Sequence, residues 1–279
     1  MSEFDADVVV VGSGFGGSVA ALRAAQAGKR VIVLEQGRRL TPDDLERGAR
    51  RTRSLLWEPA LGLTGYFRQT VLRDVVVVGG VGVGGGSIVY AAVLLEPKPA
   101  AFDAPGWQAS ERDWAAELAP HYRTAAQMLG LQVNPNVGVQ DVWLRESAQL
   151  LGVGDTFAPT PQGIDFDACI GCGQCITGCP HGAKNSLDLN YLAQAEELGA
   201  QIRPQSRVEI LVPLDVDGRP GVPGHGAHEV EAGPGLTVDG RNGWRIVVRD
   251  PVGGGKPKTI SAKEVVLAAG VLGTTELLL

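Results

Sequence analysis

Six consecutive residues near the N-terminus have the types and spacing of a phosphate-binding turn. Gly12, Gly14 and Gly17 form the pattern G-x-G-x-x-G directly after the apolar, β-branched run from residue 8 to 11. The first glycine permits a tight turn, the second lets the backbone approach a diphosphate, and the third lets a helix pack closely on a strand. The N-terminus of that helix offers N–H groups and a positive dipole end to the phosphates. The pattern therefore predicts strand, turn and helix around a dinucleotide.

An acidic residue follows this turn at the distance expected of a ribose-binding carboxylate. A second apolar strand is expected from Arg30 to Leu34, and it places Glu35 at its C-terminal end, eighteen residues after Gly17. There a carboxylate can accept hydrogen bonds from a ribose hydroxyl. A glycine-rich turn in an ordinary βαβ unit is the alternative interpretation. The motif does not separate FAD from NAD, because both cofactors present the same ADP moiety to it.

Two further segments favour a tightly held flavin. The run from Gly82 to Ser87 is a second turn at which the backbone can approach a ligand, as a cofactor much longer than ADP requires. The strand expected from Val265 to Leu267 leads through Gly270 into a helix that should begin near Thr274. One more βα unit of a parallel sheet is the alternative for this last segment.

The stretch from Val75 to Leu95 has no charged residue over twenty-one positions, which is the length of a membrane-spanning helix. Six of its residues are glycines, which destabilise a helix, and four valines precede them. We therefore expect a buried strand, a glycine turn and a helix here, and no transmembrane segment.

All four cysteines lie within eleven residues, in the order C-x2-C-x2-C-x3-C-P. Bacterial ferredoxins use this run to ligate an iron–sulfur cluster. Zinc is a weaker alternative, because structural zinc sites combine two separated pairs of ligands, and reduced or regulatory thiols are another. Disulfides are disfavoured in a chain without an export signal. The predicted cluster ligands are Cys169, Cys172, Cys175 and Cys179.

The fourth cysteine leaves the cluster type open. In two-cluster ferredoxins it ligates the other cluster, and this chain has no second cysteine set. Either Cys179 completes a [4Fe-4S] centre, or the other three cysteines hold a cluster with an open or missing corner, such as [3Fe-4S]. His181 is a conceivable substitute ligand, although an ordinary loop histidine is the simpler interpretation.

Composition limits the class of protein. A chain of 279 residues with 44% hydrophobic content can bury a large core, and it is globular. With 25 basic and 31 acidic residues and no dense basic patch, nucleic acid is not an expected partner. The first seven residues hold three acidic residues and no basic one, so a secretory signal is not expected. The predicted location is cytoplasmic.

Four segments together resemble one family of flavoproteins. GSGFGGSVAA with VIVLEQG, GVGVGGGSIVYAAVLLEPK, GAKNSLDLNYL and VVLAAGVLGTTELLL are similar to the glucose-methanol-choline (GMC) oxidoreductases, in the branch that contains cholesterol oxidase. The resemblance covers essentially the whole chain and is poorest between Val212 and Asn242. It implies that the first glycine turn and Glu35 hold the ADP part of FAD, and that Gly84 to Ser87 run beside the isoalloxazine. Where many members have Asn, this chain has Tyr90.

The resemblance completes the predicted cofactor site and implies where the catalytic residues lie. Val208 would lie near the adenine, and Ala269 with Gly270 would contact FAD again. No catalytic residue is expected within the chain, because the family places them in a region expected beyond Leu279. The full set of predicted cofactor-binding residues is Gly12, Gly14, Phe15, Gly17, Glu35, Gln36, Gly84, Gly85, Gly86, Ser87, Tyr90, Val208, Ala269, Gly270 and Thr274.

The predicted fold class is α/β, with a Rossmann-like parallel sheet of the glutathione-reductase type and a β-meander. A strand from Gln201 to Leu211 would start the meander. Residues 1–279 would form one discontinuous FAD-binding domain, with a nucleotide-binding core at 1–100 and 200–279. Residues 101–199 would form a helical insertion with the iron–sulfur segment at 165–185. Because the chain stops in an apparent helix, we expect it to be truncated before most of the substrate domain.

The predicted function is FAD-dependent oxidation of a small-molecule alcohol or sterol by hydride transfer to flavin. Because a cluster passes single electrons, its presence would favour a dehydrogenase that transfers electrons from reduced flavin to a protein or quinone acceptor. Two alternatives remain. One is an FAD/iron–sulfur electron-transfer module without an organic substrate, and the other is an inactive truncated remnant.

Overall fold

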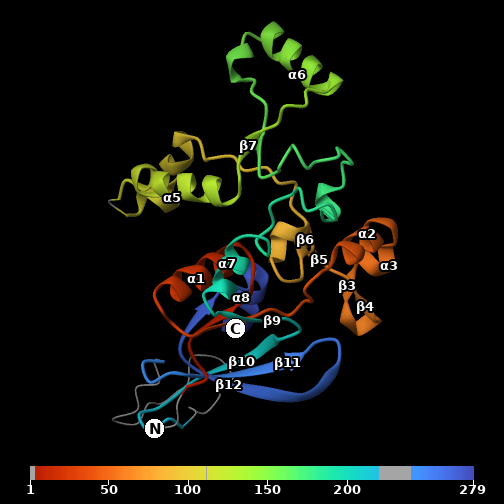
Figure 1. Ribbon diagram of the computed structural model, residues 1–279. Coiled ribbons are helices and arrows are strands. Elements are labelled where there is room, and N and C mark those ends of the chain that lie inside the picture. Colours follow the sequence, from red (N-terminus) through yellow and green to blue (C-terminus); the bar gives the residue numbers. More distant parts are fainter. Residues whose placement is uncertain (1–3, 111, 220–239) are drawn as a thin grey trace. The chain divides into compact units, whose positions relative to one another are not determined.

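A computed structural model describes residues 4–110, 112–219 and 240–279, which divide into two compact units (Figure 1). The first unit comprises the described residues of Met1–Val89, Ile176–Pro180 and Ser186–Leu279. The second comprises those of Tyr90–Cys175 and His181–Asn185. Each unit is described by itself.

The first unit is built on a six-stranded sheet in the order β10-β11-β12-β1-β2-β9. The strands β12, β1, β2 and β9 are parallel, whereas β10, β11 and β12 form an antiparallel meander. This arrangement confirms the predicted Rossmann-like sheet with a β-meander. The strands are β1 (Ala6–Val11), β2 (Val31–Leu34), β9 (Gln201–Arg203), β10 (Arg207–Pro213), β11 (Trp244–Asp250) and β12 (Gly254–Leu267).

The strand predicted from Gln201 to Leu211 is in fact two strands. Gln205 lies between β9 and β10 with a φ of 52°, in the left-handed region that a non-glycine residue seldom adopts. The chain therefore turns there, and β9 pairs with β2 while β10 pairs with β11 at the other edge of the sheet. The prediction of one continuous strand was wrong because an apolar pattern carries no signal for this turn.

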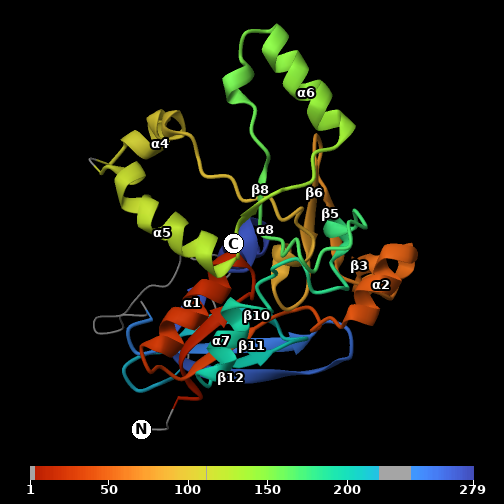
Figure 2. The ribbon, with the colours of Figure 1, turned by 45° about the horizontal axis from the view of Figure 1, so that its top comes forward.

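Helices cover the parallel strands of the first unit. α1 (Phe15–Gln26) packs on α7 (Tyr191–Glu197), and Figure 2 shows the two side by side. α1 buries Ala21, Leu22 and Ala25, spaced as one face of a helix. α8 (Gly270–Leu278) follows β12 and begins four residues before the expected start near Thr274. α2 (Pro42–Arg50) and α3 (Thr52–Leu55) follow β2 along the chain.

The core lies in the sheet and is made largely of β-branched residues. Val9, Ile32, Ile246 and Ala262 are almost fully buried, and each comes from a different strand. Full burial of a Val or Ile side chain contributes roughly 1.5–3 kcal/mol relative to exposure. Such residues also favour strand geometry, so composition and packing support the same sheet.

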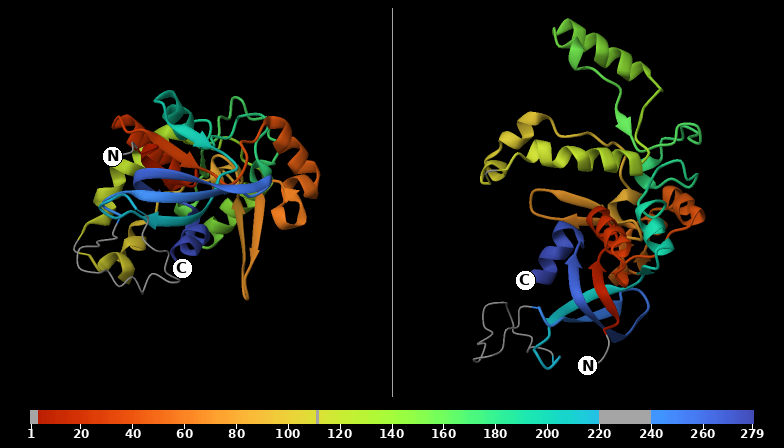
Figure 3. Two further views of the ribbon diagram at one scale, coloured as in Figure 1. Left: turned by 90° about the horizontal axis from the view of Figure 1, so that it is seen from below. Right: turned by 60° about the vertical axis from the view of Figure 1, so that its left-hand side comes forward.

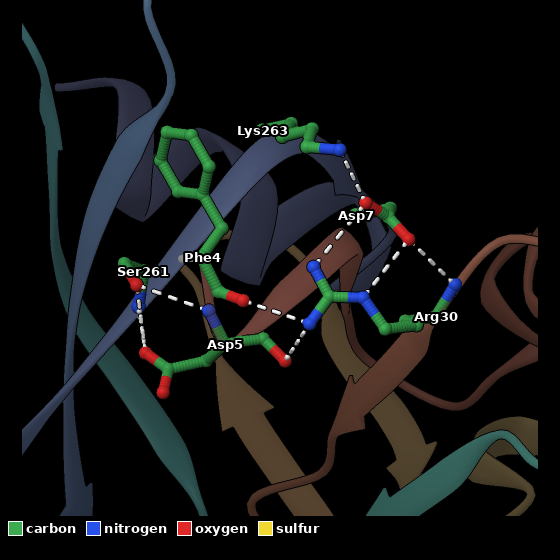
Figure 4. A network of polar contacts seen from close by, with 6 residues as sticks. All are labelled: Phe4, Asp5, Asp7, Arg30, Ser261 and Lys263. Carbon is green, nitrogen blue, oxygen red and sulfur yellow. Dashed lines mark hydrogen bonds and ion pairs between the residues drawn. The ribbon is translucent and has the colours of Figure 1, made fainter. Parts of the chain in front are cut away.

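A polar network holds the N-terminal end of β1 to its two neighbours (Figure 4). Asp7 contacts Arg30 Nε at 3.2 Å and Lys263 Nζ at 2.7 Å, so its carboxylate joins the start of β2 to β12. Asp5 Oδ2 accepts hydrogen bonds from the backbone N–H and the hydroxyl of Ser261, both at 2.7 Å. This network lies at the end of the parallel strands opposite to their carboxyl ends.

A two-stranded hairpin, β5 (Phe67–Val71) and β6 (Val76–Gly80), extends from this unit (Figure 3). The expectation of a buried strand here was wrong, because Val76 is 56% exposed and Val78 is 49% exposed. Among the described residues, β6 pairs only with β5, and its valines are exposed to solvent. The expected helix is a single 3₁₀ turn, η2 (Gly85–Ile88). Shorter elements nearby are β3 (Trp57–Glu58), η1 (Pro59–Leu61) and β4 (Leu63–Thr64).

Among the described residues, none of the helices has the length and apolarity required to cross a bilayer.

The second unit is mainly helical, with α5 (Trp114–Met128) and α6 (Val139–Leu150) as its longer elements (Figure 2). Asp113 caps α5, its side chain accepting a hydrogen bond from the N–H of Ala116. The remaining elements are η3 (Pro99–Asp103), α4 (Pro105–Gln108), β7 (Gln132–Val133), η4 (Gly154–Thr156) and β8 (Pro161–Gln162), and η5 (Cys175–Thr177) spans its boundary with the first unit.

Candidate cofactor site

The predicted motif residues follow three parallel strands that end at the same edge of the sheet. Val11 pairs with Leu34 on one side and with Leu267 on the other. Gly12 and Glu35 each come directly after one of these strand ends. Ligands of open α/β sheets bind at the carboxyl ends of parallel strands. The local sequence pattern therefore places these residues where such a ligand would lie.

The three glycines of the first turn differ in what surrounds them. A Cβ on Gly12, whose φ is 96°, would lie 2.5 Å from the carbonyl oxygen of Ala268. A Cβ on Gly17 would lie 1.9 Å from the carbonyl oxygen of Gly12. A Cβ on Gly14 would meet nothing within 4 Å. Two of the glycines thus allow close backbone packing, and the third leaves open space at the turn for a ligand.

The N-terminus of α1 is open toward an anion. Gly14 is its N-cap, no side chain caps it, and its first turn contains no acidic residue. Helix N-terminal N–H groups and the helix dipole favour bound phosphate. The first turn therefore supplies both the space and the electrostatics that a diphosphate needs.

Glu35 is buried, and its carboxylate accepts hydrogen bonds from the protein on both oxygens. Oε2 accepts from the Ser13 hydroxyl at 2.6 Å and from the Ser13 N–H at 3.2 Å, and Oε1 accepts from the Gly37 N–H at 2.9 Å. Burial raises the pKa of Glu35 above its ordinary value, while the hydrogen bonds from Ser13, Gly37 and the backbone of Gly82 oppose this. The carboxyl group is thus held by backbone and hydroxyl donors beside the first turn.

The second glycine turn packs against the first. Gly84 and Gly85 have positive φ values of 104° and 55°, and a Cβ on Gly85 would lie 2.7 Å from the Cα of Gly14. Ser87 fixes this turn from the other side. Its hydroxyl donates to the Gly84 carbonyl at 2.7 Å and accepts from the Leu187 N–H at 3.0 Å. The turn predicted to approach a long cofactor therefore lies in direct contact with the diphosphate turn.

One cavity of about 580 Å³ joins the two turns, and all its lining residues belong to the first unit. This volume lies within the usual range of small-molecule and cofactor sites. Ten of the predicted residues line it: Gly12, Gly14, Phe15, Glu35, Gln36, Gly85, Gly86, Val208, Ala269 and Gly270. Gly17, Gly84, Ser87 and Thr274 are not among the lining residues, and Tyr90 belongs to the second unit.

Other lining residues carried no sequence signal that singled them out. They include Arg68 of β5, Arg207 and Glu209 of β10, and Glu276 of α8. Arg207 pairs with Glu276 at 2.7 Å, and Arg249 pairs with Glu209 at 2.8 Å. Arg68 comes from the hairpin and belongs to neither glycine motif, so only the fold reveals it as part of the cavity.

Tyr90 has partners within the second unit. Its hydroxyl donates to the carbonyl of Asn185 at 2.7 Å, and burial, followed by the nearby thiol of Cys175, raises its pKa to about 12. Lys184, which is 2% exposed, donates from Nζ to the carbonyls of Tyr90 at 3.1 Å and Cys175 at 2.8 Å. These hydrogen bonds connect the loop that carries Cys169, Cys172 and Cys175 to Lys184 and, through it, to Tyr90.

The four cysteines are free thiols, and the structure does not support the predicted iron–sulfur site. Cys169, Cys172 and Cys175 lie in the second unit, whereas Cys179 lies in the first. Within residues 4–110, 112–219 and 240–279, no three Cys, His, Asp or Glu side chains gather in a way that could hold a metal ion. The spacing indicated a cluster, but the described geometry does not assemble its ligands.

The sheet, the paired glycine turns and the cavity define an α/β protein of the dinucleotide-binding, Rossmann-like class. Comparison with known families then assigns this chain more narrowly. A model of the GMC oxidoreductase family matches residues 6–279. The chain therefore belongs to the GMC oxidoreductases.

Curated relatives agree with this assignment. The chain is 38% identical to a cholesterol oxidase of Mycobacterium tuberculosis, over 98% of this chain and 47% of that protein. It is 35% identical to a cholesterol oxidase of Acinetobacter baumannii, over the whole of this chain and 51% of the relative. A long-chain-alcohol oxidase of Arabidopsis thaliana is 31% identical over 77% of this chain and 27% of its own. The chain thus spans about half the length of the cholesterol oxidases it matches.

Solved structures share the fold. A pyridoxine 4-oxidase from Mesorbium loti matches 95% of this chain and 50% of its own, with a TM-score of 0.55 and 19% identity. A fungal aryl-alcohol oxidase matches 99% of this chain and 48% of its own, with a TM-score of 0.59 and 15% identity. Family membership supports FAD as the cofactor. The open space at Gly14 and the uncapped N-terminus of α1 fit its diphosphate.

Proposed function

We propose that this protein binds FAD in the cavity between the two glycine turns and takes part in oxidising the hydroxyl group of an alcohol. Bound FAD would supply the acceptor for a hydride from the alcohol carbon, while the hydroxyl loses a proton to give a carbonyl. The observation that carries the proposal is the cavity itself, which joins Gly14, Glu35 and Gly86 at the carboxyl edge of the parallel strands.

For the substrate, we propose a sterol or a long-chain alcohol. The support comes from the relatives, which include cholesterol oxidases at 35–38% identity and long-chain-alcohol oxidases near 30%. The cavity described here would hold the cofactor, so its residues do not select the substrate.

Flavin reduction tests the proposal directly. The protein would be purified with FAD at the full length that its gene encodes, and each candidate alcohol would be added without oxygen. Loss of the oxidised flavin absorbance with cholesterol or a long-chain alcohol, and not with methanol, would support both parts. Reduction only by a reduced protein or a nicotinamide would favour an electron-transfer module. A protein that binds no flavin would indicate an inactive remnant.

We also propose an iron–sulfur cluster, a protein or quinone electron acceptor and a cytoplasmic location. For the cluster, the support is the cysteine spacing alone. Iron and acid-labile sulfide, measured per chain on anaerobically purified protein, test it. Replacement of Cys172 with Ser and comparison of turnover with dioxygen and with a one-electron acceptor would test the exit of electrons. If both activities stay unchanged, no cluster lies on the electron path.

A further inference from the structure

Ser13 lies in the first glycine turn, is fully buried, and has polar contacts with residues from two other segments. Its hydroxyl donates to Glu35 Oε2 at 2.6 Å and accepts from the N–H of Gly84 at 3.1 Å. The carbonyl of Gly82 lies 3.3 Å from the same oxygen. A hydroxyl has a single proton, and the shorter bond to the carboxylate takes it.

The bond to Gly84 joins two turns that are far apart in sequence. Seventy-one positions separate Ser13 from Gly84. The two turns also pack sterically, since a Cβ on Gly85 would lie 2.7 Å from the Cα of Gly14. The hydroxyl of Ser13, a residue of the first turn, thus contacts both the second turn and Glu35.

The same contacts set the orientation of Glu35. Oε2 accepts from both the hydroxyl and the N–H of Ser13, and Oε1 accepts from the N–H of Gly37. A carboxylate whose two oxygens are held in this way cannot rotate without breaking these hydrogen bonds. The orientation of this carboxylate therefore depends on Ser13.

We propose that Ser13 is a positioning residue whose hydroxyl couples the two glycine turns and orients Glu35. The ADP part and the flavin part of FAD would then bind to a single site that is already formed. This inference rests on the proposed function. ADP would occupy only the first turn and the region of Glu35, whereas FAD would also contact the second turn. Loss of the hydroxyl should therefore weaken FAD binding more than ADP binding.

The test compares two buried serines of the same segment. Ser18 is also fully buried, but its hydroxyl donates to the carbonyl of Phe15, within α1, at 3.1 Å. Titration of FAD and of ADP into the 279-residue chain would be made for the wild type, Ser13→Ala and Ser18→Ala. For Ser13→Ala we expect FAD affinity to fall about tenfold or more, because the two turns and Glu35 are then no longer held in place and must be ordered as FAD binds. The loss for ADP should be smaller, and Ser18→Ala should bind both as the wild type does.

Three results would overturn the inference: unchanged FAD affinity in Ser13→Ala, equal losses for FAD and ADP, or an equal loss in Ser18→Ala. Hydrogen exchange on the wild-type chain without cofactor gives a test that does not depend on the variant folding. Protection of the Gly84 amide supports the coupling, and rapid exchange of that amide contradicts it. A wild type that binds no FAD would refute the proposed function, yet the exchange measurement would still decide the role of Ser13.

Discussion

A β-carbon placed on Gly17 would lie 1.9 Å from the carbonyl oxygen of Gly12, so the start of α1 packs directly on the first turn. Gly17→Ala should therefore force the helix away from the turn and destabilise the chain by about 1–3 kcal/mol. Urea unfolding of the chain without FAD measures this. Gly16→Ala is the matched control, because its Cβ would meet nothing within 4 Å. Its stability should stay constant or rise by up to about 1 kcal/mol. Equal effects of the two changes would contradict the packing argument.

Gly14 offers the opposite case, a glycine that leaves space for a ligand. Gly14→Leu would add a bulky side chain at a residue that lines the cavity, and its Cβ would meet nothing within 4 Å. FAD affinity should fall more than tenfold, while stability without FAD changes by no more than about 1 kcal/mol. Ala27→Leu, at the exposed C-terminal end of α1, should leave FAD affinity unchanged. A Gly14→Leu chain that binds FAD normally would place the diphosphate elsewhere.

The buried Glu35 predicts a specific pH dependence of stability. Its pKa is raised in the folded chain, chiefly by burial, so between the unfolded and folded pKa values the folded chain binds more protons than the unfolded chain. Stability should therefore fall as pH rises from about 4.5 through that window, and Glu35→Gln should lack this decline. Unfolding free energies of the cofactor-free chain measured from pH 4.5 upward provide the check. Parallel pH profiles for wild type and variant would show that burial does not perturb this carboxyl.

Asp7 predicts the opposite sign. Hydrogen bonds from Lys263 and then Arg30 lower its pKa below the ordinary 3.8, so its contribution is complete above pH 3.8 and is lost as pH falls further. Asp7→Asn should lower the melting temperature by at most a few degrees at neutral pH, and the gap should close in acid. Asp74→Asn, at an exposed carboxylate of the β5–β6 turn, should show no such gap. A gap that is constant with pH would mean that the Figure 4 network does not depend on the charge of Asp7.

Short-range patterns were enough to predict the first turn and its surroundings. The strand, the G-x-G-x-x-G turn, the helix and Glu35 occupy one continuous segment, residues 6–35, in which each residue type meets a local geometric need. The position of Gly12 requires a positive φ, the position of Gly17 has no room for a side chain, and the position of Val9 lies in a buried strand. Such requirements can be recognised in the sequence without knowledge of distant contacts, so they were enough to predict the fold class.

Features that depend on distant segments could not be predicted in this way. The exposure of Val76 depends on which layers cover the hairpin, and the place of Arg68 in the cavity depends on how that hairpin folds back. The cysteine spacing matched a cluster motif, but the described backbone does not gather the ligands.

Ser13 shows the division between sequence and tertiary structure most directly. The amino-acid sequence determined that a serine would stand inside a glycine turn near a dinucleotide. Only the folded chain placed its hydroxyl between Glu35 and Gly84, because a hydrogen bond requires two atoms to approach within about 3 Å, and long-range packing alone brings them there.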